Sequence, residues 1–221
     1  MPGTPAPSPA VVTLPRLALV VALLAAAAAG ALYARHRLGD ESAAPATQVA
    51  AVYGVPRVLP AFSLLRPDGT RFDREALLGH YTFVFFGYTN CPDLCPTTLT
   101  TLAAALRQLG DLPARELPAV VMVSVDPARD TPEVLGRYVP HFHPSFTGAT
   151  GSDEAVSAFA SALGAAFQRH PPVEGSYAVD HTAALFLIDP SARVLALFPT
   201  PHVADTIAAD YRRIVGGAGR R

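Results

Sequence analysis

The sequence predicts an α/β sandwich with a central mixed sheet, in which the middle strands are parallel. Apolar strand-like runs alternate with segments of helical spacing along most of the chain, which is the pattern of a sheet covered by helices. The run AVVMVSV at 119–125 is apolar at nearly every position, as is typical of a parallel strand buried on both faces. Half of the 221 residues are hydrophobic, which suffices for a sizeable core.

A hydrophobic segment precedes the predicted body. Residues 1–16 form a Pro-rich tail, and residues 17–34 carry no charge. A helix of this length spans about 27 Å, close to the ~30 Å hydrocarbon thickness of a bilayer. We therefore predict either a transmembrane helix that remains as an anchor or a signal peptide cleaved at the small-x-small site at 29–31. Either interpretation indicates that the export machinery handles this protein.

The rest of the chain divides into a linker, one domain and a tail. Residues 35–57 are rich in Ala and small polar residues, so we interpret them as a linker. Residues 58–215 are of ordinary single-domain size and form the predicted folded body. Residues 216–221 are a short tail.

Strands and helices follow one another through this body. The run YTFVFFGY at 81–88 is aromatic and β-branched, which indicates a buried strand. A helix is predicted at 97–109, and another begins near Thr131, whose hydroxyl can cap it. The other predicted elements are two short strands within 60–73, a helix at 153–166, strands at 183–188 and 194–198, and a helix at 203–215. The late strand pair and a cysteine motif after the first buried strand are typical of a thioredoxin-like layout.

Charge excludes one class of partner. The formal net charge is −1, and no basic patch interrupts this balance. A nucleic-acid-binding surface needs clustered Lys or Arg, so we expect no nucleic acid as a partner.

Both cysteines of the chain lie in the segment FGYTNCPDLCP at 86–96. Cys91 and Cys95 are four residues apart, and Pro92 and Pro96 make this junction of strand and helix a shaped loop. Backbone N–H groups and the helix N-terminus near Thr97 favour negative charge, so we expect a lowered thiol pKa. A thiolate is both a nucleophile and a metal ligand.

Two thiols at this spacing are open to several roles. A structural disulfide would close a very small loop and gain little entropy, and two core cysteines have no need to share one loop. A structural zinc site normally has four protein ligands, and the chain has two cysteines. A blue-copper site normally includes a methionine ligand, and the only methionines of the chain are Met1 and Met122. Neither kind of site is therefore favoured. Reversible disulfide bonding and metal capture remain. Two thiolates with one imidazole suit Cu(I).

His181 differs from the other six histidines in its position. In VDHTAALFLID it begins a predicted buried strand, where a purely structural histidine is the alternative to a metal ligand. His141 and His143 form an H-x-H pair that we assign to a solvated loop. His170 and His202 lie beside prolines, and we expect them to be exposed.

Three segments in order resemble the Sco/SenC family of membrane-anchored copper proteins. They are FGYTNCPDLCP at 86–96, SVDPARDTPEVLGRYV at 124–139 and YAVDHTAALFLIDP at 177–190. The resemblance implies a thioredoxin fold in which Cys91, Cys95 and His181 bind one copper ion, as Cu(I) with Cu(II) as a second form. Thr182 stands where Ser is common in the family, and the hydroxyl is kept.

The resemblance also implies a function and a location. It implies a copper metallochaperone that delivers copper to the dinuclear copper site of cytochrome c oxidase, or prepares the thiols of that site. The implied partners are the oxidase subunit carrying that site, other copper chaperones and thioredoxin-like reductants. The implied location is the cytoplasmic (inner) membrane, crossed once, with the soluble domain on the periplasmic side.

A thiol-disulfide oxidoreductase without obligatory metal is the alternative function. In it Cys91 would attack a partner disulfide and Cys95 would resolve the mixed disulfide, although C-x-x-x-C spacing argues against a general thioredoxin role. Asp126 and Asp130 are interpreted as turn-forming and helix-capping residues. Asp180 either orients the imidazole of His181 or simply begins a strand.

Overall fold

A computed structural model describes residues 14–38, 46–173 and 175–218 of the chain. It divides the chain into two compact units, 1–43 and 44–221, which we treat separately. Most of the predicted N-terminal tail, the linker residues 39–45 and the tail residues 219–221 lie outside the described residues.

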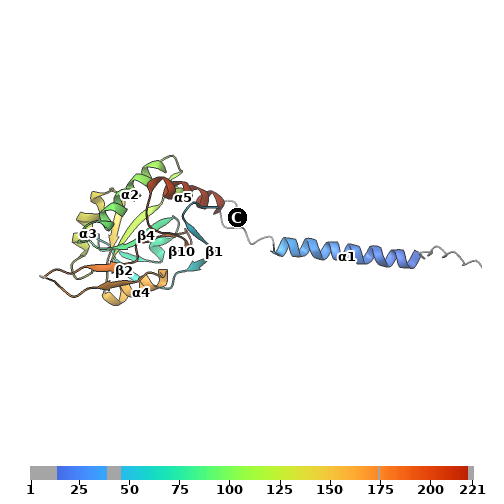
Figure 1. The fold of residues 1–221 in the computed structure, drawn as a ribbon, viewed down its shortest axis with the longest axis horizontal. Helices are drawn as coiled ribbons and strands as arrows, with labels where there is room; N and C mark the ends of the chain where they lie inside the picture. The colour runs from blue at the N-terminus through green and yellow to red at the C-terminus, as the bar shows by residue number, and fades with distance from the viewer. Residues whose placement is uncertain (1–13, 39–45, 174, 219–221) are drawn as a thin grey trace, which may run out of the picture. The chain divides into compact units, whose positions relative to one another are not determined.

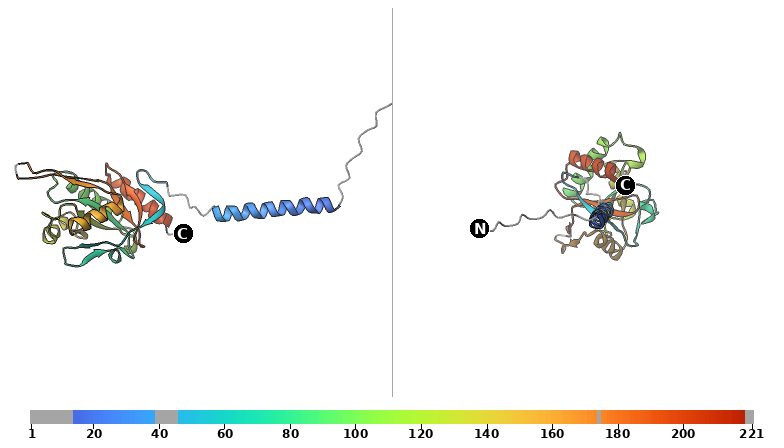
Figure 2. Two further views of the ribbon diagram at one scale, coloured as in Figure 1. Left: turned by 90° about the horizontal axis from the view of Figure 1, so that it is seen from below. Right: turned by 90° about the vertical axis from the view of Figure 1, so that its right-hand side faces the viewer.

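In the first unit the described residues form the helix α1 (Leu14–Leu38), which includes the hydrophobic segment 17–34 (Figures 1 and 2). Across the described ranges, no helix is at once long enough and apolar enough to cross a membrane.

The second unit is built on a six-stranded mixed sheet, which confirms the predicted fold class (Figure 1). The strand order is β1-β10-β9-β4-β5-β6. The strands β4, β5 and β6 are parallel to one another, and β4 is antiparallel to β9. The bounds are β1 (Ala51–Val58), β4 (Thr82–Gly87), β5 (Ala119–Ser124), β6 (Phe146–Ala149), β9 (Leu185–Ile188) and β10 (Arg193–Phe198).

Helices cover both faces of this sheet. Helices α2 (Leu94–Gln108), α3 (Pro132–Tyr138) and α5 (Ala204–Ala218) contribute to the core on one face. Helix α4 (Asp153–Leu163) packs on the other face, together with the hairpin of β2 (Ser63–Leu65) and β3 (Arg71–Asp73). A second hairpin, β7 (Phe167–Arg169) with β8 (Val179–His181), pairs outside the main sheet.

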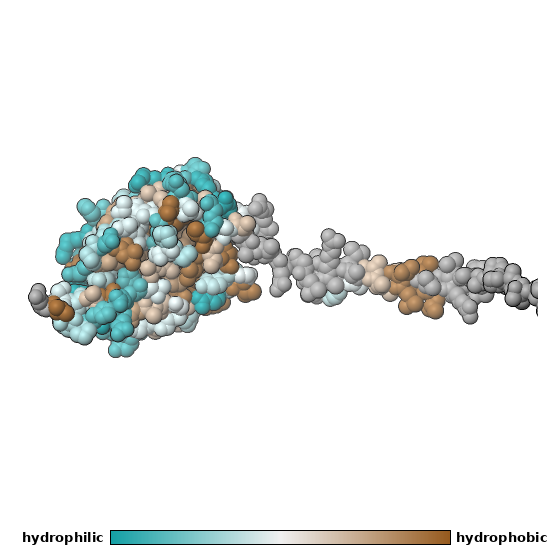
Figure 3. Space-filling model, in the orientation of Figure 1, coloured by the Kyte–Doolittle hydropathy of each residue, from teal (hydrophilic) through white to brown (hydrophobic). Residues whose placement is uncertain are grey.

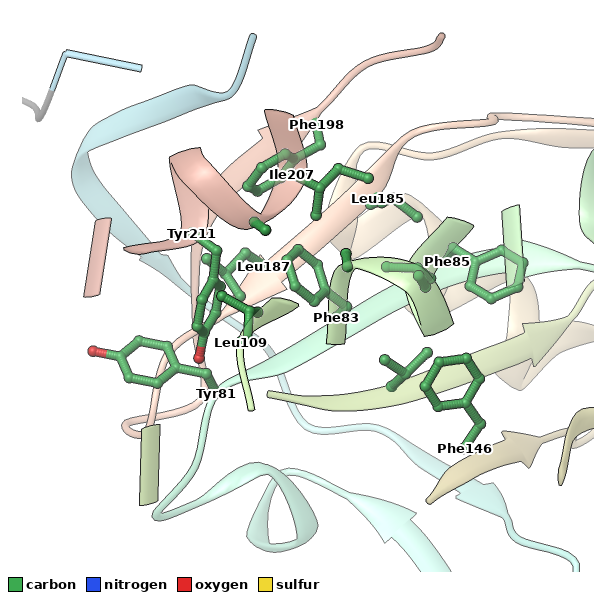
Figure 4. Close-up of a cluster of buried hydrophobic side chains, with 14 of the residues drawn as sticks. Tyr81, Phe83, Phe85, Leu109, Phe146, Leu185, Leu187, Phe198, Ile207 and Tyr211 are labelled. Carbon is green, nitrogen blue, oxygen red and sulfur yellow. The ribbon is translucent and has the colours of Figure 1, made fainter. Parts of the chain in front are cut away.

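The alternation of side chains along β4 explains the two core layers. Phe83 and Phe85 point into the layer beneath α2 and α5, where they lie with Tyr211 (Figure 4). Val84 and Phe86 point into the layer beneath α4. Successive residues of a strand face opposite sides, so a strand buried on both faces must be apolar throughout. By contrast, hydrophilic residues are spread over the face of this unit seen in Figure 3.

Helix α2 begins at Leu94, three residues before the predicted start at Thr97. Pro96 is therefore the third residue of the helix. A proline is tolerated in the first turn because the N–H that it lacks would have no partner within the helix. Cys95 accordingly belongs to the first helical turn and not to a preceding loop.

The strand β1 lies within the segment interpreted as a linker. It pairs with β10 at the edge of the sheet, and most of its side chains are exposed or half-buried. An exposed edge strand that contains Gly54 and Pro56 lacks the regular apolar alternation by which strands are recognised. The strands β6, β7 and β8 were also not predicted, because three or four residues are too few to display a period and no Pro-Asp-Gly turn marks them as it marks β2 and β3.

One carboxylate fastens the entry to β1 onto helix α5. Asp210, which is fully buried, accepts hydrogen bonds from the backbone N–H groups of Gln48, Val49 and Ala50 at 2.7, 2.8 and 3.0 Å. Burial raises the pKa of Asp210, but these bonds and Arg213 outweigh burial and hold the pKa below its ordinary value of 3.8. The carboxylate therefore stabilises the fold in its charged form.

We predict that Asp210→Asn lowers the free energy of unfolding at neutral pH by about 1–3 kcal/mol, because one buried charged acceptor is lost. A depressed folded pKa contributes stability above the unfolded pKa, and that stability is lost as the pH falls through the folded pKa. Urea unfolding should therefore show the largest difference between wild type and variant at neutral pH and a shrinking difference in acid. The exposed Asp205 on the same helix gives a control, Asp205→Asn, with little expected effect. A difference that stays constant down to strongly acidic pH would contradict this role.

Candidate metal centre

The two cysteines lie where strand β4 passes into helix α2. The Cys91 N–H donates to the carbonyl of Tyr88 at 3.2 Å, so the chain turns directly after the strand. The Cys95 N–H points at the Sγ of Cys91 at 3.5 Å. Both thiols are free, and no disulfide joins them. This local geometry keeps the two sulfurs on the same side of the loop.

The two thiols differ in exposure. Cys91 is half-buried, whereas Cys95 is 1% exposed. Burial raises the pKa of Cys95 well above its ordinary value, and the nearby Cys91 thiol adds to this effect. The predicted lowering of the thiol pKa is therefore wrong for Cys95, because desolvation outweighs the positive end of the helix. A bound metal cation would stabilise this sulfur as a thiolate.

Gly87 leaves the room that the sulfur of Cys95 occupies. A Cβ atom at position 87 would lie 2.8 Å from the Sγ of Cys95 and 3.2 Å from the ring of Phe85. Both distances are shorter than ordinary contacts, so a larger residue would displace the thiol. The close approach explains why the last residue of β4 is a glycine.

His181 reaches the thiols from a distant part of the chain. It is the last residue of β8, and its Nε2 lies 3.7 Å from the Sγ of Cys95. Its Nδ1 lies 3.3 Å from the carbonyl of Thr182, which fits an Nδ1–H donor and leaves the Nε2 lone pair directed at the sulfur. Burial lowers the pKa of His181, so the neutral imidazole is favoured. A neutral imidazole is the form that binds metal.

The aromatic ring of Tyr88 supports the imidazole. The two rings meet edge to face, with centroids 6.0 Å apart and planes at 89°. The Tyr88 hydroxyl also accepts a hydrogen bond from the Val179 N–H at 3.4 Å, two residues before His181. Tyr88 thus contacts the strand that carries the imidazole while standing three residues from Cys91.

The ligand atoms of Cys91, Cys95 and His181 all lie within 4.8 Å of one another. Among the described residues this is the one group of three or more His, Cys, Asp or Glu side chains with such a geometry. Two sulfurs and one imidazole nitrogen form a soft donor set, which fits a three-coordinate Cu(I) ion better than zinc or magnesium.

The loop at 126–130 supports the cysteine segment. The carboxylate of Asp130, which is fully buried, accepts hydrogen bonds from the Thr89 N–H at 3.0 Å, the Thr89 hydroxyl at 2.5 Å and the Ser124 hydroxyl at 2.6 Å. Thr131, and not Asp130, caps α3 by accepting from the Val134 N–H at 3.4 Å. The helix-capping role expected of Asp130 is therefore wrong, since its side chain holds Thr89 beside the cysteine loop.

Asp180 does not orient the imidazole of His181. Its carboxylate lies 2.7 Å from the Nε2 of His170 on the opposite arm of the hairpin. The partner of the His181 Nδ1 is instead the backbone carbonyl of Thr182. A backbone group leaves no sequence signal, so this partner could not be predicted.

Other histidines of the second unit contact different residues. His143 contacts the Ser145 hydroxyl at 2.8 Å, and His141 is exposed, as a solvated loop requires. His202 is half-buried and not exposed as expected, and its Nδ1 lies 3.4 Å from the Thr98 hydroxyl. Burial lowers the pKa of His202, because the ring packs beside α2.

Residues 51–216 match the model of the SCO1/SenC family, which is three quarters of the chain. The chain belongs to the SCO1/SenC family. The SCO1/SenC match includes both cysteines, His181 and the loop at 126–130, so the resemblance expected from the three sequence segments is confirmed.

Relatives of known sequence and structure support the assignment to SCO1/SenC. The chain is 34% identical over 146 residues to the mitochondrial protein SCO1 homolog 1 of Arabidopsis thaliana, covering 66% of this chain but only 43% of that relative. The crystal structure of Arabidopsis thaliana ScoI with copper bound aligns with a TM-score of 0.67 and 31% identity, over 74% of this chain and 99% of that one. The crystal structure of yeast Sco1 with copper bound aligns with a TM-score of 0.66 and 30% identity, over 75% of this chain and 91% of that one. These alignments confirm the thioredoxin-like fold.

We predict unequal reactivity of the two thiols of this SCO1/SenC protein. Iodoacetamide at mildly alkaline pH should modify Cys91 at least roughly tenfold faster than Cys95, because Cys95 is buried and its thiolate is disfavoured. Mass spectrometry of the variants Cys91→Ser and Cys95→Ser measures each rate separately. Equal rates in folded protein, with both rising together in urea, would contradict the buried environment of Cys95.

Proposed function

We propose that this chain binds one copper ion through Cys91, Cys95 and His181 and delivers it to a partner protein. The observation that carries the proposal is the convergence of two sulfurs and one imidazole nitrogen within 4.8 Å. Relatives about 30% identical over most of their length have been solved with copper bound. The neutral imidazole and the two thiols provide a soft donor set that suits Cu(I), with Cu(II) as a second form.

The unequal exposure of the two thiols supports transfer by ligand exchange. Cys91 is half-buried and Cys95 is buried, so an incoming thiolate would approach the copper from the side of Cys91. A three-coordinate ion leaves room for a further ligand, and the copper can then pass between proteins without release into water. We propose the dinuclear copper site of cytochrome c oxidase as the recipient, by analogy within the family.

The location follows from the same proposal. We infer that the segment 17–34 directs the protein to the cytoplasmic membrane, and that the copper-binding body lies on the periplasmic side. Supporting this, residues 17–34 carry no charge and have about the length that crosses the hydrocarbon core as a helix. Copper delivery outside the cytoplasm would require the export that the hydrophobic segment indicates.

We predict that His181→Ala weakens Cu(I) binding by more than about 100-fold, the upper end of losses seen when only a supporting group is removed. Anaerobic titration of the full-length reduced protein against a chromophoric Cu(I) chelator measures the affinity, and X-ray absorption should count two sulfurs and one nitrogen in the wild type. His170→Ala is the matched control, because His170 lies on the same hairpin but pairs with Asp180. An unchanged affinity in His181→Ala, with a native far-UV spectrum, would overturn the assignment of this ligand.

A thiol-disulfide oxidoreductase is the second candidate, favoured by one observation. A half-exposed Cys91 and a buried Cys95 resemble an attacking and a resolving thiol. The Cys91 thiolate would attack a partner disulfide and release one partner thiolate, and Cys95 would then attack the Cys91 sulfur and release the other. The two electrons that reduce the partner come from the Cys91–Cys95 dithiol, which becomes a disulfide.

The two candidates differ in their need for His181. We predict that His181→Ala loses oxidase assembly at limiting copper in cells, while Cys91→Ser and Cys95→Ser lose it at any copper level. Cytochrome c oxidase activity in complemented cells measures the outcome. If His181→Ala supports normal assembly at low copper and still reduces a model disulfide, the redox function accounts for the activity and copper delivery does not.

A further inference from the structure

The hairpin that carries His181 needs side-chain contacts to hold its position. Strands β7 and β8 have three residues each and pair with one another outside the six-stranded sheet. A two-stranded hairpin is marginally stable by itself, so backbone pairing alone cannot fix the imidazole beside the thiols. The contacts between this hairpin and the rest of the body therefore decide where His181 lies.

Tyr177 provides the first of these contacts, four residues before His181. Its hydroxyl donates a hydrogen bond to the Oδ1 of Asp126 at 2.6 Å. Asp126 is fully buried at the end of β5, in the loop that also contains Asp130. The hydrogen bond to the Asp126 carboxylate raises the pKa of Tyr177, so the hydroxyl keeps its proton and remains a donor.

Arg129 holds the same tyrosine from a second side. Its Nε pairs with the other oxygen of Asp126, and its Nη2 donates to the carbonyl of Tyr177 at 3.1 Å. The guanidinium also lies over the ring of Tyr177, 3.7 Å from the centroid, and 5.7 Å from the ring centroid of Tyr88. Cation–π contact adds to the hydrogen bonds and fixes the plane of the ring.

The other arm of the hairpin is fastened to the same strand end. Arg169 on β7 donates to the carbonyl of Val125 at 2.7 Å and pairs with Asp153 at 2.7 Å. Its Nε is 4.0 Å from the Oδ1 of Asp126. Both arms are thus tied to the residues that end β5.

We propose that Tyr177 and Arg129 are positioning residues for His181, and that they act through the buried carboxylate of Asp126. This inference rests on the proposed copper site, because it concerns the ligand that completes that site. Asp126 would hold the histidine arm while Asp130, four residues later, holds the cysteine arm through Thr89. The single loop would then set the distance between the imidazole and the two sulfurs before any metal arrives.

The variant Tyr177→Phe tests this inference, since it keeps the ring over Arg129 and removes only the hydroxyl. We expect its Cu(I) affinity to fall roughly tenfold, as is typical when a group that supports a metal ligand is removed. X-ray absorption should still count two sulfur neighbours, while the imidazole nitrogen signal weakens. The two sulfurs should be unaffected because Tyr177 does not contact the cysteine loop through a hydrogen bond.

A double-mutant cycle separates positioning from a general loss of stability. In the His181→Ala background, Tyr177→Phe should cause no further loss of Cu(I) affinity, because the group through which it acts is already absent. Tyr211→Phe is the matched control: its hydroxyl donates to the Glu116 carbonyl at 2.5 Å, in the core layer near Tyr81. This control should lower stability without changing copper affinity.

The possible outcomes distinguish a failure of the positioning role from a failure of the proposed copper site. Wild-type affinity in Tyr177→Phe, or an equal loss in the presence and absence of His181, would overturn the positioning role while leaving the copper site intact. A wild-type protein that takes up no copper would overturn the proposed function, and the positioning role with it.

Discussion

The antiparallel pairing of β4 with β9 in the middle of the sheet decides where the chemistry of this protein lies. Thr82 pairs with Ile188 and Val84 with Phe186, so the end of β4 lies beside the beginning of β9. The cysteine loop leaves the end of β4, and His181 precedes β9 by a short connection. A slip of one residue would turn every core side chain of β4 to the wrong face, so the core fixes the register. Groups 86 residues apart in the chain are thereby brought into contact.

Two buried carboxylates in the loop at 126–130 contact the two segments that the sheet brings together. Burying a charged group is costly unless hydrogen bonds and opposite charges compensate, and Asp126 and Asp130 are both fully buried. Asp126 is compensated by Arg129 and the Tyr177 hydroxyl, whereas Asp130 is compensated by neutral donors. The Tyr177 hydroxyl adds to this compensation when the histidine hairpin packs on the loop, and Thr89 adds to it from the cysteine segment. The loop at 126–130 therefore contacts both segments that carry the ligands of the candidate metal centre.

The elements that sequence reasoning predicted are those with a clear hydrophobic pattern. The strand at 81–88 and the helix at 153–166 correspond to β4 and α4 within a few residues, because long apolar runs and helical spacing reveal them. The edge strand β1 was interpreted as linker, since its exposed residues carry no alternation. The start of α2 was placed too late, because prolines beside the cysteines suggested a loop where the structure has a first helical turn.

The sequence by itself determined the kind of chemistry: two thiols at fixed spacing, since neighbours in the chain remain neighbours in any fold. It also singled out His181 by its position at a predicted buried strand, and the resemblance of three segments to a family implied its role as a ligand. The tertiary structure alone decided that the imidazole reaches a sulfur, that burial raises the pKa of Cys95, and that Asp130 binds Thr89. These outcomes depend on desolvation and on contacts between segments far apart in the chain, and neither is encoded in local residue patterns.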